Sequence, residues 1–561
     1  MIIHVESSRN SRFYNNSLYR DYIFDFSKLS EYFAYDYRDI ESYKKRMNDI
    51  EELYDDNLRG GLVEILHEYN LEHGAGSQTL ENIRMLGESG TAVIIGGQQP
   101  GLFTGPVFMI YKIISVLKLS SFISEKTGIK VVPCFWNASD DSSIGQVDSI
   151  GIITGILEKI KIDTSSIRKN TRFSSIYLER KKYIEVLQSL EGLIPETDFI
   201  DEWLGLLRDS TDDKYRDPEG KNRINLPGLF SNIILKLFAE YGIVMVDPSD
   251  KRLKRMGVGF LKVDMEKYSS IAKTVNSRGD KLEKAGYHAQ LNTKTNTLNH
   301  FFNVEGIREK VECLQGLRYR VGDKIFSGKE LISLADSDPG LISWNVAMRP
   351  VVQDRIFPVM ATVCGPGEVS YFAQISGVYD LTDTRLPVIY PRFSATIIEK
   401  KISRIIERFE SMDELAGTSR EEILKKSLKD SISVDDLADS LEKKLEGVLK
   451  NFEKEVSCAG ISTGSSFDRI KRNIKKEVQV LKGKIYSELK KKDQWARDAL
   501  DRFYLNLFPD GRLQEREINF FYYANRYGIG IMEGLYDSFK PFDFEHKLLY
   551  LNQDGKNEKN G

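Results

Sequence analysis

The sequence predicts an α/β protein with a doubly wound parallel sheet, connecting insertions and a long antiparallel helical coiled-coil arm. Three observations predict this fold class. Short apolar runs recur, each followed by a polar or glycine-rich loop and an apolar or amphipathic helix, which is the rhythm of βαβ units. The runs are continuous rather than alternating, as in strands covered on both faces. Residues 395–505 instead repeat apolar side chains at spacings of three and four.

Composition and charge narrow the class of protein. The chain has 561 residues and a formal net charge of −3, so no overall basic field favours nucleic acid or an anionic membrane as a partner. Its four cysteines lie far apart, without the C-x-x-C pair of a zinc or redox site. No apolar run of about 18 residues and no apolar signal segment occurs. We expect a cytoplasmic protein without a tightly bound metal or redox cofactor.

The first complete strand–turn–helix unit spans residues 91–118, after a mostly helical segment, 1–90, that we assign to the core. An apolar strand is followed by a turn with four glycines, and Pro106 suits the first position of the next helix. The start of that helix is a potential anion site. We take the candidate ligand contacts from this turn: Gln98, Gln99, Thr104 and Gly105. The alternative is a plain βα turn, since neither a dinucleotide fingerprint nor a P-loop is present.

The second buried strand, residues 131–136, is followed by Asp140 and Asp141. In open parallel sheets ligands bind at the carboxyl ends of strands, so both carboxylates should share a rim with Gln98 and Gln99. Adjacent carboxylates can orient an amine, hold a cation or act as acid and base. A helix N-cap explains the same residues equally well.

Two insertions are predicted within the core, which we place at residues 91–394. They lie near 152–227 and 265–345, on either side of a further helix and strand that end in a polar loop at 247–250. The second insertion carries His288 on an extended segment. We retain His288 as a candidate substrate contact, although a structural role is the more common one for a lone histidine.

The segment 343–394 combines buried strands with an unusual number of polar side chains. A strand at 359–363 runs into a Gly-Pro-Gly turn, and another short strand follows at 387–390. Buried polar groups need partners, often a ligand, and arginine suits carboxylates and phosphates. The candidates in this region are Arg349, Gln353, Glu368, Tyr371 and Arg392.

Residues 395–505 predict two long antiparallel helices. Apolar residues repeat through 434–452 and again through 470–489, and charges of both signs cover the rest. The seam can join two chains in a homodimer or close a hairpin within one chain. Residues 506–561 return to compact sequence, and we expect them to pack back on the core.

Six sequence blocks, in order, permit a comparison with a known family: GGQQPGLFTGPVFMIYKIISVLKL, PCFWNASDD, GYHAQ, MRPVVQDRIFPVMATVCGPGEVSYFAQ, PRFSATI and FPDGRLQERE. Together they resemble the BshC family of bacillithiol biosynthesis over nearly the whole chain. The resemblance implies a Rossmann-like core and a coiled-coil domain that supports a homodimer. One departure stands out: the family usually carries Glu-Asp-His-Asp where this chain has Asp140, Asp141, Ser142 and Ser143.

The resemblance also implies an activity, the ligation of cysteine to glucosaminyl-malate in the last step of bacillithiol biosynthesis. Amide formation requires activation of the cysteine carboxyl group, so ATP or ADP with Mg²⁺ is the expected cofactor. We assign Asp140, Asp141 and Glu368 to catalysis and the other candidates to substrate binding. The alternatives are a related nucleotidyltransferase, an amide ligase with a different acceptor, and a catalytically degenerate dimeric scaffold.

Overall fold

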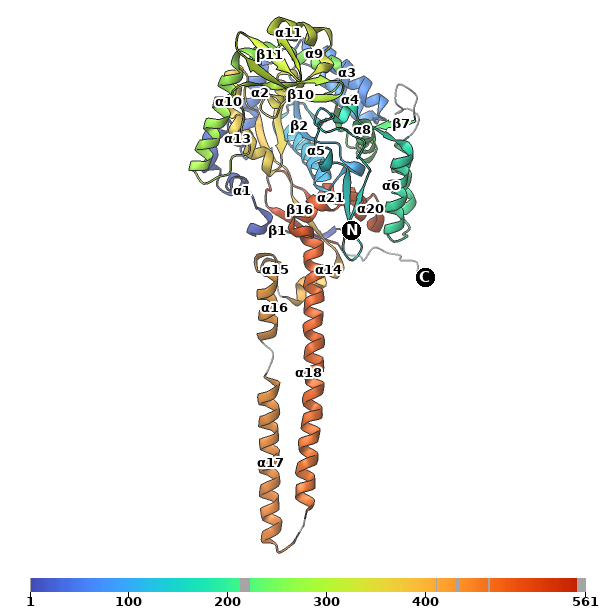
Figure 1. Ribbon diagram of the computed structural model, residues 1–561, viewed down its shortest axis with the longest axis vertical. Helices are drawn as coiled ribbons and strands as arrows, with labels where there is room; N and C mark the ends of the chain where they lie inside the picture. Colours follow the sequence, from blue (N-terminus) through green and yellow to red (C-terminus); the bar gives the residue numbers. More distant parts are fainter. Residues whose placement is uncertain (1, 212–221, 410, 430–432, 463–464, 552–561) are drawn as a thin grey trace. The chain divides into compact units, whose positions relative to one another are not determined.

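The computed structural model describes residues 2–211, 222–409, 411–429, 433–462 and 465–551 (Figure 1). Their contacts form two compact units. One comprises the described residues up to Lys400 together with those from Pro509 onward, and the other comprises Lys401–Phe508. The predicted fold class is confirmed, because the first unit contains a doubly wound parallel sheet with inserted elements and the second is helical.

The central sheet of the first unit has five strands, and every neighbouring pair is parallel. Its order is β15-β14-β2-β3-β8. Along the chain, β2, β3 and β8 extend the sheet in one direction, and β14 and β15 then extend it from β2 in the opposite direction. A reversal of this kind opens a crevice beyond the carboxyl ends of the strands. The strands are β2 (Ala92–Gln98), β3 (Val131–Asn137), β8 (Val244–Val246), β14 (Val359–Cys364) and β15 (Val388–Pro391).

Helices cover both faces of this sheet because its strands are apolar on both faces. Val93 and Ile95 of β2 face a core that includes α3 (Leu58–Glu72) and α4 (Ser77–Leu86). On the opposite face, Gly96 lets α5 (Phe108–Thr127) lie against β2, since a Cβ atom there would come within 2.9 Å of a methyl group of Val116. Further helices of the unit include α1 (Ser17–Phe24), α2 (Ile40–Leu53), α8 (Leu226–Leu237), α9 (Lys251–Gly257), α12 (Arg349–Ile356) and α13 (Pro366–Leu381).

An antiparallel sheet is inserted between α9 and α12 (Figure 1). Its order is β12-β11-β10-β9-β13, and α10 (Phe260–Lys284) and α11 (Gly328–Ser337) pack on it around a separate apolar core. The strands are β9 (Thr297–Val304), β10 (Ile307–Leu314), β11 (Arg318–Val321), β12 (Lys324–Ser327) and β13 (Ile342–Trp344). The earlier insertion contains β4 (Ser149–Ile153), β5 (Leu157–Lys161), β6 (Tyr177–Glu179), α6 (Arg180–Leu193), α7 (Ile200–Asp209) and β7 (Arg223–Asn225).

The two ends of the chain meet in a third sheet, β1-β17-β16. Its strands are β1 (Ile2–Ser8), β16 (Ala395–Ile398) and β17 (His546–Leu551). In the C-terminal segment, β17 is preceded by α19 (Gln514–Glu517), α20 (Phe520–Tyr527) and α21 (Ile531–Ser538). Buried polar side chains hold this sheet: Ser394 Oγ contacts His546 Nδ1 at 2.8 Å, and Thr396 Oγ1 contacts Nε2 at 2.8 Å.

His546 makes the stability of the protein depend on pH. Burial lowers the pKa of His546 to about 4, from 6.5. Because the unfolded chain binds this proton more readily, stability is present above pH 6.5 and is lost as the pH falls through about 4. We expect this group to contribute a loss of about 3 kcal/mol over that window. Urea unfolding at several pH values measures it, and His546→Gln should flatten the dependence; an unchanged slope in the variant would contradict the assignment.

The second unit contains the predicted antiparallel helices. Helices α17 (Val434–Cys458) and α18 (Ser466–Leu507) lie side by side within one chain (Figure 1), joined by ion pairs such as Lys471–Glu453 at 3.0 Å and Lys475–Glu442 at 3.0 Å. The hairpin alternative is therefore present in the monomer. Several apolar side chains of the predicted seam remain exposed, among them Leu437, Phe452, Leu481 and Ile485. Homodimer formation stays a prediction. The shorter helices are α14 (Lys400–Arg408), α15 (Met412–Gly417) and α16 (Arg420–Lys429).

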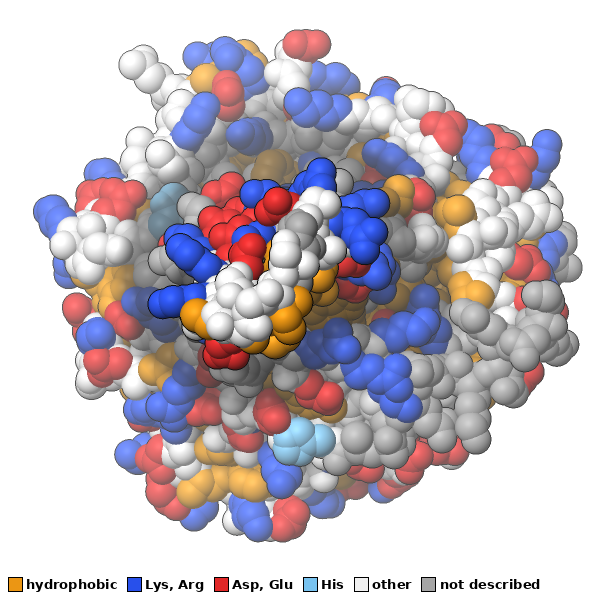
Figure 2. All heavy atoms as spheres, turned by 90° about the horizontal axis from the view of Figure 1, so that it is seen from below, with side chains coloured by type: hydrophobic (Ala, Val, Ile, Leu, Met, Phe, Trp, Pro, Cys, Tyr) orange, Lys and Arg blue, Asp and Glu red, His pale blue; other side chains and the backbone are white. Residues whose placement is uncertain are grey.

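The surface agrees with the near-neutral sequence charge. On the face in Figure 2, lysine and arginine side chains are interspersed with aspartate and glutamate. Among the described residues, no helix combines the length and the apolar character needed to span a bilayer.

Candidate functional site

A cavity of about 350 Å³ lies beyond the carboxyl ends of β3 and β8, bounded by the inserted sheet and by α9 and α12. Asp140, Asp141, Lys254 and Arg308 form its polar end, and Arg349 also lines it. Its remaining wall is largely apolar and aromatic, which is typical of pockets for small molecules. The residues of that wall are Trp136, Ala138, Pro248, Leu253, Gly257, Phe301, Trp344, Asn345, Val346, Val352 and Ile356.

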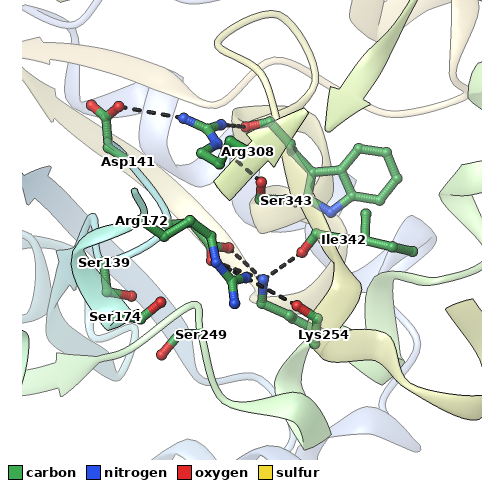
Figure 3. A network of polar contacts seen from close by, with 12 residues as sticks. Ser139, Asp141, Arg172, Ser174, Ser249, Lys254, Arg308, Ile342 and Ser343 are labelled. Atoms are coloured by element: carbon green, nitrogen blue, oxygen red, sulfur yellow. Dashed lines mark hydrogen bonds and ion pairs between the residues drawn. The ribbon is translucent and has the colours of Figure 1, made fainter. Parts of the chain in front are cut away.

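Asp140 is held by two cations from different parts of the chain, Lys254 and Arg172, both of which are labelled in Figure 3. Lys254 Nζ lies 2.8 Å from both carboxylate oxygens and also donates to the carbonyl of Ile342. Arg172 Nη1 donates to Asp140 at 3.2 Å and to the Gly340 carbonyl at 3.0 Å. Burial lowers the pKa of Lys254 to about 8, although Asp140 opposes this shift and Arg172 adds to it. Asp140 therefore ties the loop after β3 to α9 and to the inserted sheet.

Asp141 is the more accessible carboxylate, with 35% of its side chain exposed. Gln99 Nε2 donates to one of its oxygens, and the Ser142 amide donates to the other at 2.7 Å. Arg308 Nη1 lies 3.4 Å away, and the same guanidinium donates to Ser343 Oγ at 3.1 Å and to the Trp344 carbonyl at 3.1 Å (Figure 3). The turn after β2 and the loop after β3 thus meet at Asp141, as the sequence predicted for this rim.

Arg349 differs from the other cations of the cavity in its partners. Its Nη1 donates to Gln353 Oε1 at 3.0 Å and its Nη2 donates to the Tyr371 hydroxyl at 3.3 Å. The guanidinium lies 5.8 Å from the ring centroid of Trp136. No carboxylate of the described residues pairs with it. A cation held by neutral groups beside an apolar wall is a candidate partner for a ligand carboxylate or phosphate.

The glycine-rich turn after β2 is closed by the C-terminal segment. Thr104 and Gly105 both have positive φ angles, 72° and 73°, and Asn519 Nδ2 donates to the Gly105 carbonyl at 2.6 Å. The amide of Val107, just before α5, donates to the Ile518 carbonyl at 2.8 Å. Thr104 is fully buried, and its hydroxyl has no partner among the described residues. The chain itself therefore covers the predicted anion site at this helix start, and the ligand roles of Thr104 and Gly105 stay predictions.

The turns after β2 and β14 are neighbours, joined by the buried Lys112. Its Nζ donates to the Gly97 carbonyl and to Glu368 Oε2, each at 2.5 Å, and lies 3.5 Å from Gln98 Oε1. Glu368 also accepts the Gly365 amide at 2.7 Å, which caps α13. The two turns meet as expected, but the cavity described above opens on the β3 and β8 side of them. Glu368 and Gln98 do not line it.

Among the predicted site residues, Asp140, Asp141 and Arg349 line the cavity. Gln99, Gln353 and Tyr371 form hydrogen bonds with these residues but do not line it, and Arg392 and His288 are likewise outside its lining. Arg392 is 3% exposed in its side chain and forms two hydrogen bonds with Glu515, at 2.5 and 3.2 Å. Its guanidinium is used to bind the C-terminal segment, which satisfies the charge without a ligand. His288 is exposed on the segment between α10 and β9. Neither residue is brought next to Asp141 or Arg349.

The sequence analysis did not predict four basic residues in or near the site: Lys254, Arg172, Arg308 and Lys112. Lys254 lies on the helix that follows the polar loop at 247–250, so the rule that ligands bind at strand ends could have found it. Arg172 and Arg308 come from insertions, and no local signal points to them. Lys112 lies on α5 and was hidden in an apolar helix pattern.

Fold and cavity together define a Rossmann-like α/β protein with a cation-rich cavity beyond its strand ends. Comparison with family models gives the particular family. The model described as the bacillithiol biosynthesis BshC N-terminal Rossmann-like domain matches residues 3–393, and that of the BshC C-terminal coiled-coil domain matches residues 395–551. The chain belongs to the BshC family of bacillithiol biosynthesis, as the sequence blocks predicted.

Curated relatives cover nearly the full length of the chain. A protein of Bacillus cereus (strain AH820) is 30% identical over 525 residues, which is 90% of this chain and 93% of the relative. A protein of Bacillus thuringiensis (strain Al Hakam) is 29% identical over 529 residues, 91% of this chain and 94% of the relative. One of Bacillus anthracis (strain A0248) is 29% identical over 525 residues, 90% and 93%. Each of these relatives is named "Putative cysteine ligase BshC".

Proposed function

We propose that the protein is a cysteine ligase that joins the carboxyl group of cysteine to the amine of glucosaminyl-malate, forming the amide bond of bacillithiol in the cytoplasm. The family and the names of the relatives support the ligase class. The observation that supports a carboxylate-bearing substrate is the environment of Arg349, which lines the cavity and donates hydrogen bonds to neutral groups. An acceptor that carries carboxylates supplies a direct anionic partner, in addition to the charges of Glu368 and Asp354 that act on Arg349 without hydrogen bonds to it.

The malate end of the acceptor fits the side of the cavity formed by Arg349. The planar guanidinium can offer a pair of parallel donors to a carboxylate, and it lies 5.8 Å from the ring centroid of Trp136. Gln353 and Tyr371 fix the orientation of the guanidinium. We assign substrate binding to Arg349, with Gln353 and Tyr371 as residues that orient it without lining the cavity, whereas Arg392 is engaged by Glu515.

The amino group of cysteine fits Asp141. This carboxylate is partly exposed, and Gln99, Ser142 and Arg308 hold its orientation. Asp141 can still accept a further hydrogen bond from an ammonium group, which would place the cysteine carboxyl group towards the cavity. Asp140 has a different role, because Lys254 and Arg172 already neutralise its charge. It fixes these two cations at the edge of the site.

The donor set also fits a nucleotide phosphate. Arg308 and Lys254 lie at the polar end of the cavity, and aromatic rings of Trp136, Phe301 and Trp344 form its wall. Among the described residues no cluster of three or more acidic, histidine or cysteine side chains could hold a metal ion. We propose ATP with Mg²⁺ carried by its phosphates. When bound, the nucleotide supplies the activation of the cysteine carboxyl group.

The protein's own contribution is to hold the reactants together and to stabilise negative charge. Binding two reactants side by side removes most of the entropic cost of their encounter. Fixed cations at Arg308, Arg349 and Lys254 favour the charge that develops on oxygen as the amide forms. Lys254 has a pKa of about 8 and so lies near the range in which it can exchange a proton.

The test is product formation by the purified protein with cysteine, glucosaminyl-malate, ATP and Mg²⁺. We expect mass spectrometry to show one amide product whose appearance needs all three organic substrates. A product with another amine, and none with glucosaminyl-malate, would indicate an amide ligase with a different acceptor. Calorimetry that detects no binding of any of the three would indicate the scaffold alternative. Thiol profiles of cells with and without the gene check the same assignment in vivo.

A further inference from the structure

Behind Arg349, a chain of hydrogen bonds leads away from the cavity into the core. Gln353, one turn along α12, accepts from Arg349 through Oε1 and donates through Nε2 to Asp354 Oδ1, both at 3.0 Å. The other oxygen of Asp354 accepts the Tyr379 hydroxyl of α13 at 2.5 Å. Gln353 and Asp354 are 2% and 8% exposed. The carboxylate therefore lies two hydrogen bonds away from the guanidinium.

The chemistry of these groups fixes the direction of each hydrogen bond. A guanidinium only donates, so Arg349 requires the oxygen end of the Gln353 amide. An ionised carboxylate only accepts, so Asp354 requires the nitrogen end. Both requirements are met by the same orientation of the Gln353 amide, with Oε1 towards Arg349 and Nε2 towards Asp354, so the amide is held in one of its two possible orientations. A reversed amide would turn its NH₂ group towards the cation and withdraw the acceptor from it.

We propose that Asp354 is a positioning residue that sets the direction of Arg349 through the amide of Gln353. The proposal rests on the proposed function to the extent that Arg349 binds the carboxylate of the substrate. It goes beyond that function because Asp354 itself does not line the cavity. It also makes substrate affinity depend on the protonation state of a buried group.

Protonation of Asp354 on Oδ1, the oxygen that faces Gln353, would reverse the hydrogen bond between the carboxyl group and the amide. A protonated oxygen facing Gln353 donates, so it favours the amide oxygen, and the NH₂ group then faces Arg349. Burial raises the pKa of Asp354 to about 6, against hydrogen bonds from Tyr379 and Gln353 and the charges of Arg46 and Arg349. Three groups face the Asp354 carboxyl from neighbouring elements: Arg46 from α2, Tyr379 from α13 and Arg349 from the same helix, α12. The other titratable residues near Asp354 line a small cavity that Asp354 shares with them, and they are Asp49, Tyr54, Arg355 and Arg385.

The kinetic test compares pH profiles. For the wild type, we expect KM for the carboxylate-bearing substrate to rise about tenfold between pH 7.5 and pH 5, the effect of weakening one charge-assisted hydrogen bond, with a smaller change in kcat. Asp354→Asn cannot titrate and should lose this acid limb. Asp49→Asn, in the adjacent small cavity, should keep it. Persistence of the limb in Asp354→Asn, or its absence from the wild type, would overturn the proposal.

A second measurement does not depend on turnover. In protein labelled with ¹⁵N-arginine, the guanidinium signal of Arg349, identified by its loss in Arg349→Lys, should shift with a midpoint near pH 6 in the wild type and stay constant in Asp354→Asn. An Arg349 signal that does not titrate, or that titrates equally in both proteins, would overturn the positioning role. If no product forms in any assay, the ligase proposal fails, and this titration still decides the role of Asp354.

Discussion

Replacement of Arg349 by methionine is expected to reduce kcat/KM for the proposed acceptor, glucosaminyl-malate, by about thirtyfold or more. The reason is that truncating one partner of a buried charge pair, here the pair proposed between Arg349 and a substrate carboxylate, costs about 2–5 kcal/mol. Methionine keeps much of the apolar stem and removes the charge and the fork of donors. The reduction should be seen mainly in kcat/KM for the acceptor substrate, whereas the KM for cysteine should change little. Steady-state kinetics with each substrate varied in turn measures both effects.

Arg355 provides the matched control on the same helix. It donates to the Leu53 carbonyl at 2.9 Å and lines the small cavity on the other side of α12. Arg355→Met should therefore leave kcat/KM within a few-fold of the wild type. Arg349→Lys keeps the charge but not the planar fork, so an intermediate loss is expected. If Arg349→Met matched the Arg355→Met control, the anion-binding role of Arg349 would be wrong.

Replacement of Glu515 by glutamine is expected to destabilise the first unit by about 3–5 kcal/mol, because it leaves the buried Arg392 without its counter-charge. Glu515 is 1% exposed and accepts from Arg392, from Ser394 Oγ at 3.0 Å and from the Ala395 amide at 3.1 Å. These contacts join the segment after β15 to the C-terminal segment. The loss should appear as a lower midpoint in urea unfolding at neutral pH.

The pH dependence of Glu515 supplies a second readout. Burial alone would raise the pKa of Glu515, but the charge and hydrogen bonds of Arg392 outweigh it and hold the pKa below 4.5. The stability from this group is present above pH 4.5 and is lost as the pH falls through the lower folded value. Glu515→Gln should lack this acid-dependent part. Glu81→Gln, which removes an exposed partner of Arg84, serves as the control and should change stability little; equal effects would refute the buried-pair argument.

Local sequence patterns predicted the sheet because each strand carries its own signal. The apolar runs, the glycines at the turns and the polar loops at the strand ends are all short-range features. The same logic located Asp140 and Asp141, since a loop after a buried strand has a known place in a parallel sheet. Arg349 and Tyr371 were found as polar residues beside apolar strands.

The rest of the site depends on tertiary contacts that short-range patterns do not encode. Arg308 contacts Asp141 from β10 of the inserted sheet. In the sequence, the whole of the earlier insertion and several further elements lie between the two residues. Arg392 satisfied every local criterion for a ligand contact, yet its partner is Glu515, far along the sequence. Conspicuous motifs such as PRFSATI and LQERE thus include residues that hold the C-terminal segment. The sequence alone could not separate that role from substrate binding.

The pairing of β1 with β17 has a consequence for synthesis on the ribosome. Ile2 is in register with Leu551, so β1 is translated long before its partner β17. Until then, the backbone amides and carbonyls of the nascent strand must bind water or a chaperone. A polypeptide that is terminated before β17 would keep this edge unpaired and become a target for quality-control proteases, so pairing of β1 reports that β17 has been made.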